Sequence, residues 1–471
     1  MIKFGTSGFR GIIAENFTKE NIQKIAYALT KVFKGEDIVP IGYDNRFMGK
    51  EFAKWISEVL LAYGKKIKFF EVPVPSPLIA FETLNVEFGL MVSASHNPYV
   101  YNGIKIFQRG GRELTSQQNQ TLEKIANKIK HSKIFSKSFD VAVKEKQVSL
   151  TKNLSPYCNS ILKNVDAKLI KNSGLSIYYN AMQGSSVLCA KQIFDKLALN
   201  VTYMNTDVNP NFKFGLPAPY KDNIHDQETL AKKDKFEDFG FALDGDGDRI
   251  SFVDENGEFY DCNYISAMVY DDILSSGQKC DFVKNCAMTS LVDKIAEANN
   301  QKVILAGVGF KNTASKMLEN PEALIGAESN GYAVKGHILY KDGLMGALRA
   351  IEVLAKNQKP LSKVIKSLKK KYKFPCEVVE YAYPFTDEQR TKINKLLFVE
   401  KVLPEVKGRK IQKVSYDDGL KITYENGYWG VLRFSGNENV IRLFAEMENL
   451  EECEKTIKVY EKLIGLKTRQ V

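Results

Sequence analysis

Helix-like and strand-like segments alternate along this chain from residue 17 to about residue 360, and this alternation restricts the possible folds more than any other feature. Apolar residues recur at helical spacing from Thr18 to Phe33, and a second amphipathic segment runs from Glu51 to Tyr63. Between them, the apolar run from Asp37 to Tyr43 is typical of a strand. Strands that alternate with helices in this way predict α/β domains with open sheets.

The 471 residues are too many for one hydrophobic core, because a typical domain contains about 150 residues. A polar, lysine-rich stretch at 128–151 indicates a first boundary near its end, and Pro375 follows a second basic run. Beyond Pro375 the pattern predicts a hairpin at 420–434, then a strand and a helix, which is typical of an α+β domain. We expect four domains, at residues 1–150, 151–254, 255–370 and 371–471.

The net charge of +11 favours an anionic partner, which could be a nucleic acid or a small anionic substrate. The lysines are spread along most of the chain, and the densest basic run, at 366–373, is typical of a solvated helix end or a linker. No nucleic-acid-binding motif accompanies this run. We therefore expect a small anionic substrate and no nucleic-acid partner.

The seven cysteines are scattered and include no Cys-x-x-Cys pair. This usage is typical of reduced thiols in a cytoplasmic protein, and it argues against a disulfide framework or a zinc site. The first residues form no apolar signal segment, and no apolar run approaches the roughly 18 residues of a membrane span. We expect a cytoplasmic location and no membrane association.

The segment Ser93-Ala94-Ser95-His96-Asn97-Pro98 follows a strand-like run at 88–92. A hydroxyl at the carboxyl end of an α/β strand is a plausible position for a nucleophile. The same residues could also form a simple turn that Ser and Asn cap and Pro closes. Between the two serines, we favour Ser95 because it directly precedes His96.

Three carboxylates follow another predicted strand in the segment Asp244-Gly245-Asp246-Gly247-Asp248-Arg249. Like charges at this spacing repel one another unless a hard cation binds, and Mg²⁺ with oxygen ligands fits them. An EF-hand is excluded because its loop needs Gly where Arg249 stands, and because the flanking segments resemble strands. A solvated acidic turn is the alternative.

Three further segments have the composition of ligand-binding loops, although each could be an ordinary turn. The glycines of 5–11 would let the backbone approach a ligand closely. The polar segment 326–332 follows a strand-like run and presents Glu328. The segment 433–439, with Arg442 beyond it, combines arginines, a hydroxyl and a glycine, which suits phosphate binding.

These five segments, in this order, resemble the α-D-phosphohexomutase superfamily, which includes phosphoglucomutase and phosphomannomutase, over essentially the whole chain. The resemblance implies an α/β protein with four domains around a central cleft. Three related mixed α/β domains would precede a smaller C-terminal α+β domain like the TATA-binding protein. Each domain would contribute one main loop to the cleft.

The resemblance also implies roles for individual residues. Ser95 would carry a phosphoryl group and, with Asp244, Asp246 and Asp248, would hold Mg²⁺. His96 is placed with the catalytic residues, Arg10 would contact the phosphoserine, and Lys105 would transfer protons with its pKa lowered by cations such as Arg10. The expected substrate-binding residues are Arg249, Lys311, Glu328, Asn330, Arg433, Ser435, Gly436, Asn437 and Arg442.

The implied activity is the interconversion of hexose 1-phosphate and hexose 6-phosphate through a phosphoserine, with hexose 1,6-bisphosphate as intermediate and activator. Glucose is favoured over mannose because residues 308–311 resemble those of glucose-acting members. The sugar and phosphate loops depart from the family pattern, with Asn330 in place of Ser and Asn437-Glu438-Asn439 in place of Thr-Glu-Pro. The alternatives are a phosphoglucosamine mutase and a non-catalytic phosphosugar-binding homologue. A monomer or a homodimer is expected.

Overall fold

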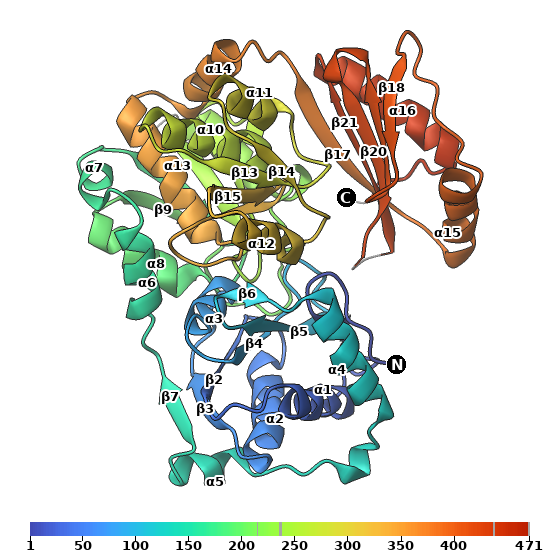
Figure 1. The fold of residues 1–471 in the computed structure, drawn as a ribbon. Coiled ribbons are helices and arrows are strands. Elements are labelled where there is room, and N and C mark those ends of the chain that lie inside the picture. The colour runs from blue at the N-terminus through green and yellow to red at the C-terminus, as the bar shows by residue number, and fades with distance from the viewer. Residues whose placement is uncertain (214, 235–237, 437–438, 470–471) are drawn as a thin grey trace.

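Four separate β-sheets follow one another along the chain (Figure 1). The computed structural model describes residues 1–213, 215–234, 238–436 and 439–469. We name the units around the sheets domains I to IV in chain order. The predicted class is confirmed, since three mixed α/β units precede a different, sheet-rich unit. None of the described helices has the length and apolar composition needed to cross a membrane.

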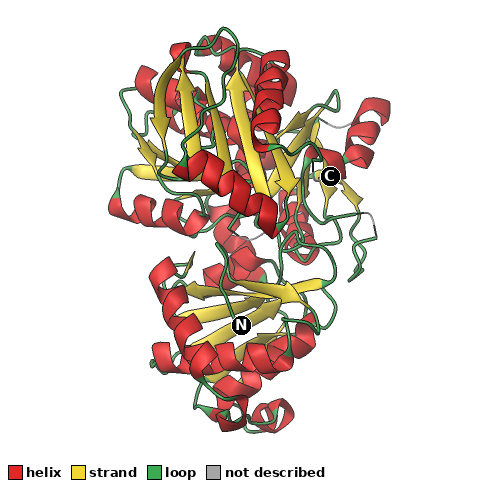
Figure 2. Ribbon diagram, turned by 90° about the vertical axis from the view of Figure 1, so that its right-hand side faces the viewer, coloured by secondary structure: helices red, strands yellow, loops and turns green. Residues whose placement is uncertain are grey.

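Domain I contains a seven-stranded mixed sheet in the order β1-β5-β4-β2-β3-β7, with β6 paired to β5. Helices cover both faces of this sheet, at the bottom of Figure 2. Helix α1 begins where Thr18 accepts a hydrogen bond from the Asn21 N–H, and it buries Ile22, Ile25 and Leu29. The strands are β1 (Phe9–Ile12), β2 (Ile38–Tyr43), β3 (Lys66–Phe70), β4 (Phe88–Val92), β5 (Tyr101–Gln108), β6 (Arg112–Glu113) and β7 (Val148–Thr151). The helices are α1 (Lys19–Val32), α2 (Gly49–Ala62), α3 (Ser76–Glu82), α4 (Ser116–Lys128), the 3₁₀ turn η1 (His131–Lys133) and α5 (Phe139–Lys144).

Domain II has a five-stranded sheet in the order β12-β11-β10-β8-β9. Its strands are β8 (Ser176–Asn180), β9 (Asn200–Met204), β10 (Phe239–Leu243), β11 (Ile250–Asp254) and β12 (Phe259–Tyr260). Its helices are α6 (Ser155–Lys163), α7 (Ala167–Lys171), α8 (Val187–Leu197), η2 (Lys221–Asn223) and α9 (His225–Asp234). The segments on either side of the three aspartates are therefore strands, as the sequence predicts.

Domain III has a four-stranded sheet in the order β14-β13-β15-β16. Its strands are β13 (Asp281–Lys284), β14 (Val303–Leu305), β15 (Ala323–Glu328) and β16 (Gly331–Val334). Its helices are α10 (Cys262–Ser275), α11 (Leu291–Ala298), α12 (Phe310–Glu319), α13 (Gly343–Asn357) and α14 (Leu361–Lys371). Residues 366–371 of the basic run form the end of α14, so of the two predicted alternatives, a helix end or a linker, this part is a helix end.

Domains I, II and III repeat one local arrangement. In each, a strand with a parallel neighbour (β4, β10 or β15) is followed by an antiparallel neighbour (β5, β11 or β16). The connections are the segments with Ser95, with the three aspartates, and with Asn330. Three of the five segments singled out in the sequence therefore occupy the same place in three related sheets.

Domain IV, at the upper right of Figure 1, has an antiparallel sheet in the order β17-β21-β20-β19-β18. Its strands are β17 (Glu377–Pro384), β18 (Ile411–Ser415), β19 (Leu420–Tyr424), β20 (Trp429–Phe434) and β21 (Val440–Met447). Its helices are α15 (Asp387–Asn394), the π-helical turn η3 (Lys395–Val399), η4 (Glu425–Gly427) and α16 (Leu450–Ile464). The predicted hairpin, strand and C-terminal helix are confirmed.

The hydrophobic cores show how the domains are joined. One continuous cluster of buried residues runs from α3 of domain I through domain II into domain III. Domain IV has its own core, and a small apolar cluster of Ala287, Trp429, Val431 and Phe444 joins it to domain III. Domain IV is therefore the unit with the least apolar attachment to the rest of the protein.

The structure differs from two local expectations. The polar loop expected at 326–332 is reduced to Ser329 and Asn330, because β15 continues to Glu328, which pairs with Gly331 on β16. Arg10 lies on a strand rather than in a glycine-rich loop, because β1 pairs with β5 and sets Arg10 opposite Gly103.

Candidate active site

A cavity lies where the four domains meet, and each domain contributes side chains to it. The lining residues that the sequence also singled out are Arg10, Ser95, His96, Asp248, Arg249, Glu328, Asn330, Arg433, Ser435, Gly436 and Arg442. Thr6 of domain I lies against both Gly309 of domain III and Gly436 of domain IV, and a Cβ on either glycine would overlap its side chain. Glycine at these two positions therefore allows the three loops to meet.

Ser95 has an unusual backbone conformation, with a φ of 54° in the left-handed region. For a residue with a Cβ this conformation is strained, and such strain is concentrated at functional sites. Its Oγ lies 2.6 Å from Asp244 Oδ2 and 3.3 Å from His96 Nδ1. The loop thus presents the Ser95 hydroxyl to the aspartates of domain II.

Ser93 has a different position from Ser95. Its Oγ donates a hydrogen bond to Asp44 Oδ2 at 2.6 Å and accepts one from the Ser95 N–H at 2.8 Å. Ser93 is fully buried and is not among the described residues that line the cavity. Its hydroxyl supports the loop, whereas that of Ser95 faces the cavity.

Arg46, which the sequence reasoning missed, holds the Ser95 loop from behind. Its Nη2 donates to the carbonyl oxygens of Ser95 and Asn97, both at 2.6 Å, and its Nη1 donates to those of Pro98 and Tyr101 at 2.9 and 3.0 Å. Its Nε lies 3.2 Å from Asp44 Oδ2. One buried guanidinium therefore fixes four carbonyls of the loop.

A signal for Arg46 is present in the sequence. Asp44 and Arg46 follow β2, which is the parallel neighbour of β4. Because the carboxyl ends of parallel strands meet at one sheet edge, residues after β2 lie beside the loop after β4. Burial raises the pKa of Asp44 to about 6, although the charge of Arg46 and the hydrogen bond from Ser93 act in the opposite direction.

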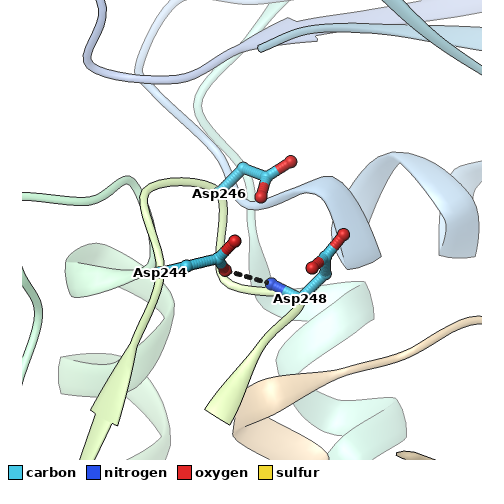
Figure 3. A group of neighbouring side chains, drawn as sticks. All are labelled: Asp244, Asp246 and Asp248. Atoms are coloured by element: carbon cyan, nitrogen blue, oxygen red, sulfur yellow. Dashed lines mark hydrogen bonds between the residues drawn. The ribbon is translucent and has the colours of Figure 1, made fainter. Parts of the chain in front are cut away.

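Asp244, Asp246 and Asp248 converge on the turn between β10 and β11 (Figure 3). One carboxylate oxygen of each lies within 4.8 Å of the others, and all three side chains are buried. Asp244 Oδ1 accepts hydrogen bonds from the backbone N–H groups of Asp248 and Arg249, both at 3.0 Å. Gly247, with a φ of 72°, permits this tight turn.

The electrostatics of this cluster fit a divalent cation. Burial, together with the charges of Asp248 and Asp246, raises the pKa of Asp244 to about 7. The oxygens Asp246 Oδ1 and Asp248 Oδ1 are buried, and neither accepts a hydrogen bond from any residue that the structure describes. Buried anionic oxygens without donors are costly, and a hard cation such as Mg²⁺ would satisfy them.

Lys105, on β5, bridges two of the aspartates. Its Nζ lies 2.6 Å from both Asp246 Oδ2 and Asp248 Oδ2 and 3.0 Å from the Tyr340 hydroxyl. We expected cations such as Arg10 to lower the pKa of Lys105, and this expectation is wrong. Burial and Arg10 do lower it, but the two carboxylates outweigh them and raise the pKa above its ordinary value.

Arg10 and Arg249 add positive charge to the cavity wall. Arg10 Nη1 donates to Asn97 Oδ1 in the Ser95 loop. Arg249 Nη1 donates to the hydroxyl of Tyr220, whose ring also packs edge-on against His96 and lies under Arg442. Tyr220 therefore connects groups from three domains, and no sequence motif marked it.

Glu328 and Asn330, at the turn between β15 and β16, are held by partners within domain III. Glu328 Oε1 accepts hydrogen bonds from the Gly309 N–H at 2.8 Å and from Asn285 Nδ2 at 3.2 Å. Asn330 Oδ1 accepts one from Lys341 Nζ at 3.1 Å. Lys311 is not among the described residues that line the cavity, and its partial burial lowers the pKa of its amine.

The domain IV residues lie around the end of the β20–β21 hairpin. Arg433 and Arg442 stand opposite one another in the register of the two strands. Arg442 Nη1 lies 2.6 Å from Glu380 Oε1, and Arg433 Nε lies 3.7 Å from Asp418 Oδ1. Ser435 and Gly436 line the cavity, and Asn437 lies outside the described residues.

Comparisons with known proteins identify the family of this chain. Models of the phosphoglucomutase/phosphomannomutase family match its α/β/α domain I at residues 1–133, domain II at 155–257 and domain III at 261–372. A phosphoglucomutase/phosphomannomutase of Thermococcus kodakarensis is 30% identical over 470 residues, with 98% of each chain covered. The chain belongs to this family, whose members are isomerases acting on sugar phosphates, and it is an enzyme of the phosphohexomutase class.

Two further similarities mark the range of the family. A phosphoglucosamine mutase of Methanocaldococcus jannaschii is 26% identical over 480 residues, with 98% of each chain covered. The crystal structure of a putative phosphomannomutase from Thermus thermophilus has the same fold, with a TM-score of 0.86 and 24% identity over 98% of this chain and 99% of that chain. The relatives thus carry names for several hexose phosphates.

Proposed function

We propose that this protein interconverts hexose 1-phosphate and hexose 6-phosphate, with glucose favoured and mannose possible, through a phosphoserine and a hexose 1,6-bisphosphate intermediate. The observation that carries the proposal is the contact between Ser95 Oγ and Asp244 Oδ2 in a cavity that all four domains line. A serine hydroxyl beside three buried carboxylates and several arginines suits phosphoryl transfer, in which positioning and charge stabilisation dominate.

The chain's own residues would divide the work of the reaction. Ser95 gives its phosphoryl group to a free hydroxyl of the sugar phosphate and later takes the other phosphoryl group back. Asp244, Asp246 and Asp248, with Ser95, would hold Mg²⁺, which would neutralise charge on the transferring group. Arg10 stabilises the phosphoryl group on the Ser95 loop.

Two groups are candidates for proton transfer. His96 Nδ1, at 3.3 Å from Ser95 Oγ, can hold a proton near the reacting hydroxyl. Lys105 remains charged between its two aspartates and is therefore better suited to donate a proton than to accept one. From the sequence we expected Lys105 to transfer protons with a lowered pKa, and we now assign it the role of a proton donor instead.

The substrate would lie between the sugar loop and domain IV. Glu328 and Asn330 face the sugar hydroxyls, and Lys311, which is not among the described residues that line the cavity, is a further candidate for substrate binding. Arg433, Ser435, Gly436, Asn437 and Arg442 bind the phosphate that does not react, and Arg249, which contacts Tyr220 as Arg442 does, contributes further positive charge. Because the bisphosphate must turn end for end, this one distal site accepts either phosphate in turn.

A substrate panel tests the proposal. Glucose 1-phosphate, mannose 1-phosphate and glucosamine 1-phosphate are each supplied with Mg²⁺ and catalytic glucose 1,6-bisphosphate, and products are identified by phosphorus NMR. We expect turnover with glucose highest, mannose next, and none above background for Ser95→Ala. Turnover of glucosamine phosphate well above glucose phosphate would favour the alternative function, phosphoglucosamine mutase. Absence of turnover with every sugar would favour a non-catalytic phosphosugar-binding protein.

A further inference from the structure

Two carboxylates of the cation site are held by side chains from other domains. Asp246 Oδ2 accepts a hydrogen bond from the hydroxyl of Ser76, at the start of α3 in domain I. Asp248 Oδ2 accepts one from the hydroxyl of Tyr340, which lies three residues before the first residue of α13, Gly343, in domain III. Lys105 lies 2.6 Å from both of these oxygens. The Oδ2 atom of each carboxylate is thus occupied by donors of the protein.

The Oδ1 atoms of the same two carboxylates, in contrast, have no hydrogen-bond donor among the described residues. Asp246 Oδ1 and Asp248 Oδ1 are both buried. The ammonium of Lys341 comes no closer than 3.5 Å to Asp248 Oδ1. Because the Oδ2 atoms are occupied, the free lone pairs of both carboxylates belong to Oδ1. One carboxylate oxygen of each of the three aspartates lies within 4.8 Å of the others.

We propose that Ser76 and Tyr340 are positioning residues of the cation site, a role that rests on the Mg²⁺ site of the proposed function. Each hydroxyl fixes the rotation of one carboxylate, so that its other oxygen is directed at the cation. Groups that hydrogen-bond to metal ligands commonly tune metal affinity in this way. Neither hydroxyl is a ligand of the cation in this proposal, and Tyr340 also lines the cavity, whereas Ser76 is not among the described residues that line it.

The two residues also make cation binding depend on the packing of three domains. The aspartates belong to domain II, Ser76 to domain I and Tyr340 to domain III. Backbone contacts reinforce both attachments, because the Ser76 N–H donates to the Asp246 carbonyl at 2.8 Å and the Gly343 N–H donates to the Gly247 carbonyl at 3.0 Å. The cation site is therefore complete only where domains I, II and III are packed together.

Direct measurement of Mn²⁺ binding to the full-length protein, by electron paramagnetic resonance of the free ion, tests this inference without using activity. We expect Ser76→Ala and Tyr340→Phe each to raise the dissociation constant about 10- to 100-fold. Tyr340→Phe keeps the ring contact with Phe107, so the fold is preserved. The matched controls are Tyr270→Phe and Ser57→Ala, whose buried hydroxyls donate to backbone carbonyls away from the site, and these should bind Mn²⁺ like the wild type.

The outcomes separate this inference from the proposed function. Weaker binding by both variants, with kcat recovered at saturating Mg²⁺, supports the positioning role. Wild-type affinity in both variants would overturn the inference and leave the proposed cation site intact. Failure of the wild type to bind Mn²⁺ would overturn the cation site and the inference together.

Discussion

Two regions of the cavity are built very differently: the Ser95 loop with the aspartate turn, and the end of the β20–β21 hairpin with Arg433 and Arg442 in domain IV. Four carbonyls of the Ser95 loop share one buried guanidinium, that of Arg46, and Asp244 accepts hydrogen bonds from two backbone N–H groups and from Ser95. In domain IV, Arg433 and Arg442 are partly exposed, and each has a carboxylate within 4 Å.

The attachment of the two regions differs in the same direction. The aspartate turn is enclosed by the core that domains I, II and III share, whereas domain IV has its own core and joins domain III mainly through the small cluster of Ala287, Trp429, Val431 and Phe444. A centre that transfers a phosphoryl group gains from fixed geometry. A site that must accept two different phosphates in turn gains from looser attachment. The contrast therefore matches the two tasks in the proposed reaction.

Replacing Arg46 should have the largest effect on this contrast. In Arg46→Met the four loop carbonyls lose their donor and Asp44 becomes a buried, unpaired charge, so we expect the free energy of unfolding to fall by about 3–5 kcal/mol. Displacement of Ser95 should lower kcat by about 100-fold. Urea unfolding and steady-state kinetics measure the two effects.

Two companion variants keep this test informative. Arg46→Lys retains a charge near Asp44, so it should fold better than Arg46→Met while kcat stays low. Arg349→Met removes another arginine that pairs with a carboxylate, Glu352, outside the cavity, and should leave kcat unchanged. A kcat within about threefold of the wild type in both Arg46 variants would show that the loop does not need this guanidinium.

Replacing Arg433 should affect binding more than chemistry. A hydrogen bond to a charged group contributes about 1.5–3 kcal/mol, so we expect Arg433→Ala to raise the KM for the hexose phosphate roughly 10- to 150-fold and to change kcat less. Arg409→Ala removes another domain IV arginine, one bound to Glu448 and Glu452, and serves as the control. A fall in kcat at constant KM would place Arg433 at the reaction centre instead.

Replacing Glu446 should have the smallest effect, confined to the attachment of domain IV. Its carboxylate accepts hydrogen bonds from the Thr289 hydroxyl, the Ser290 N–H and Trp429 Nε1. Glu446→Ala removes the acceptor of the Thr289 hydroxyl and the Ser290 N–H, while Trp429 Nε1 keeps its hydrogen bond to Ser290 Oγ, so we expect the free energy of unfolding to fall by about 1–3 kcal/mol. Limited proteolysis should then cleave this variant faster between α14 and β17. The control variant Glu448→Ala should be cleaved there at the rate of the wild type. Equal cleavage rates would contradict this attachment.

Much of the fold was predictable because its signals are local. Strand β4 was predicted at its observed bounds, since it is a short apolar run that ends at a polar turn. The short turn at Ser329 and Asn330 was not predictable, because β15 continues to Glu328 only through its pairing with β13 and β16. Such pairing is a tertiary effect that the local polarity of residues 326–332 does not contain.

The candidate site, like the fold, has residues that local sequence signals reveal and residues that only tertiary contacts reveal. Ser95 and the three aspartates stand in compact motifs, so residue type and spacing could single them out, and the family resemblance then implied their roles. Tyr340 could not be found, because its hydroxyl meets Lys105 across 235 residues of sequence. The direction of the pKa shift of Lys105 was missed for the same reason, since Asp246 and Asp248 approach it from another domain.

The phosphorylation state of Ser95 tests the central claim most directly. The wild-type protein is incubated with glucose 1,6-bisphosphate, its intact mass is measured, and the modified residue is located by peptide mapping. We expect the gain of one phosphoryl group, on Ser95, that excess glucose 1-phosphate or glucose 6-phosphate removes, and no gain in Ser95→Ala. An unchanged mass, a phosphoryl group on another residue, or a phosphoserine that the sugar phosphates do not discharge would contradict Ser95 as the phosphoryl carrier.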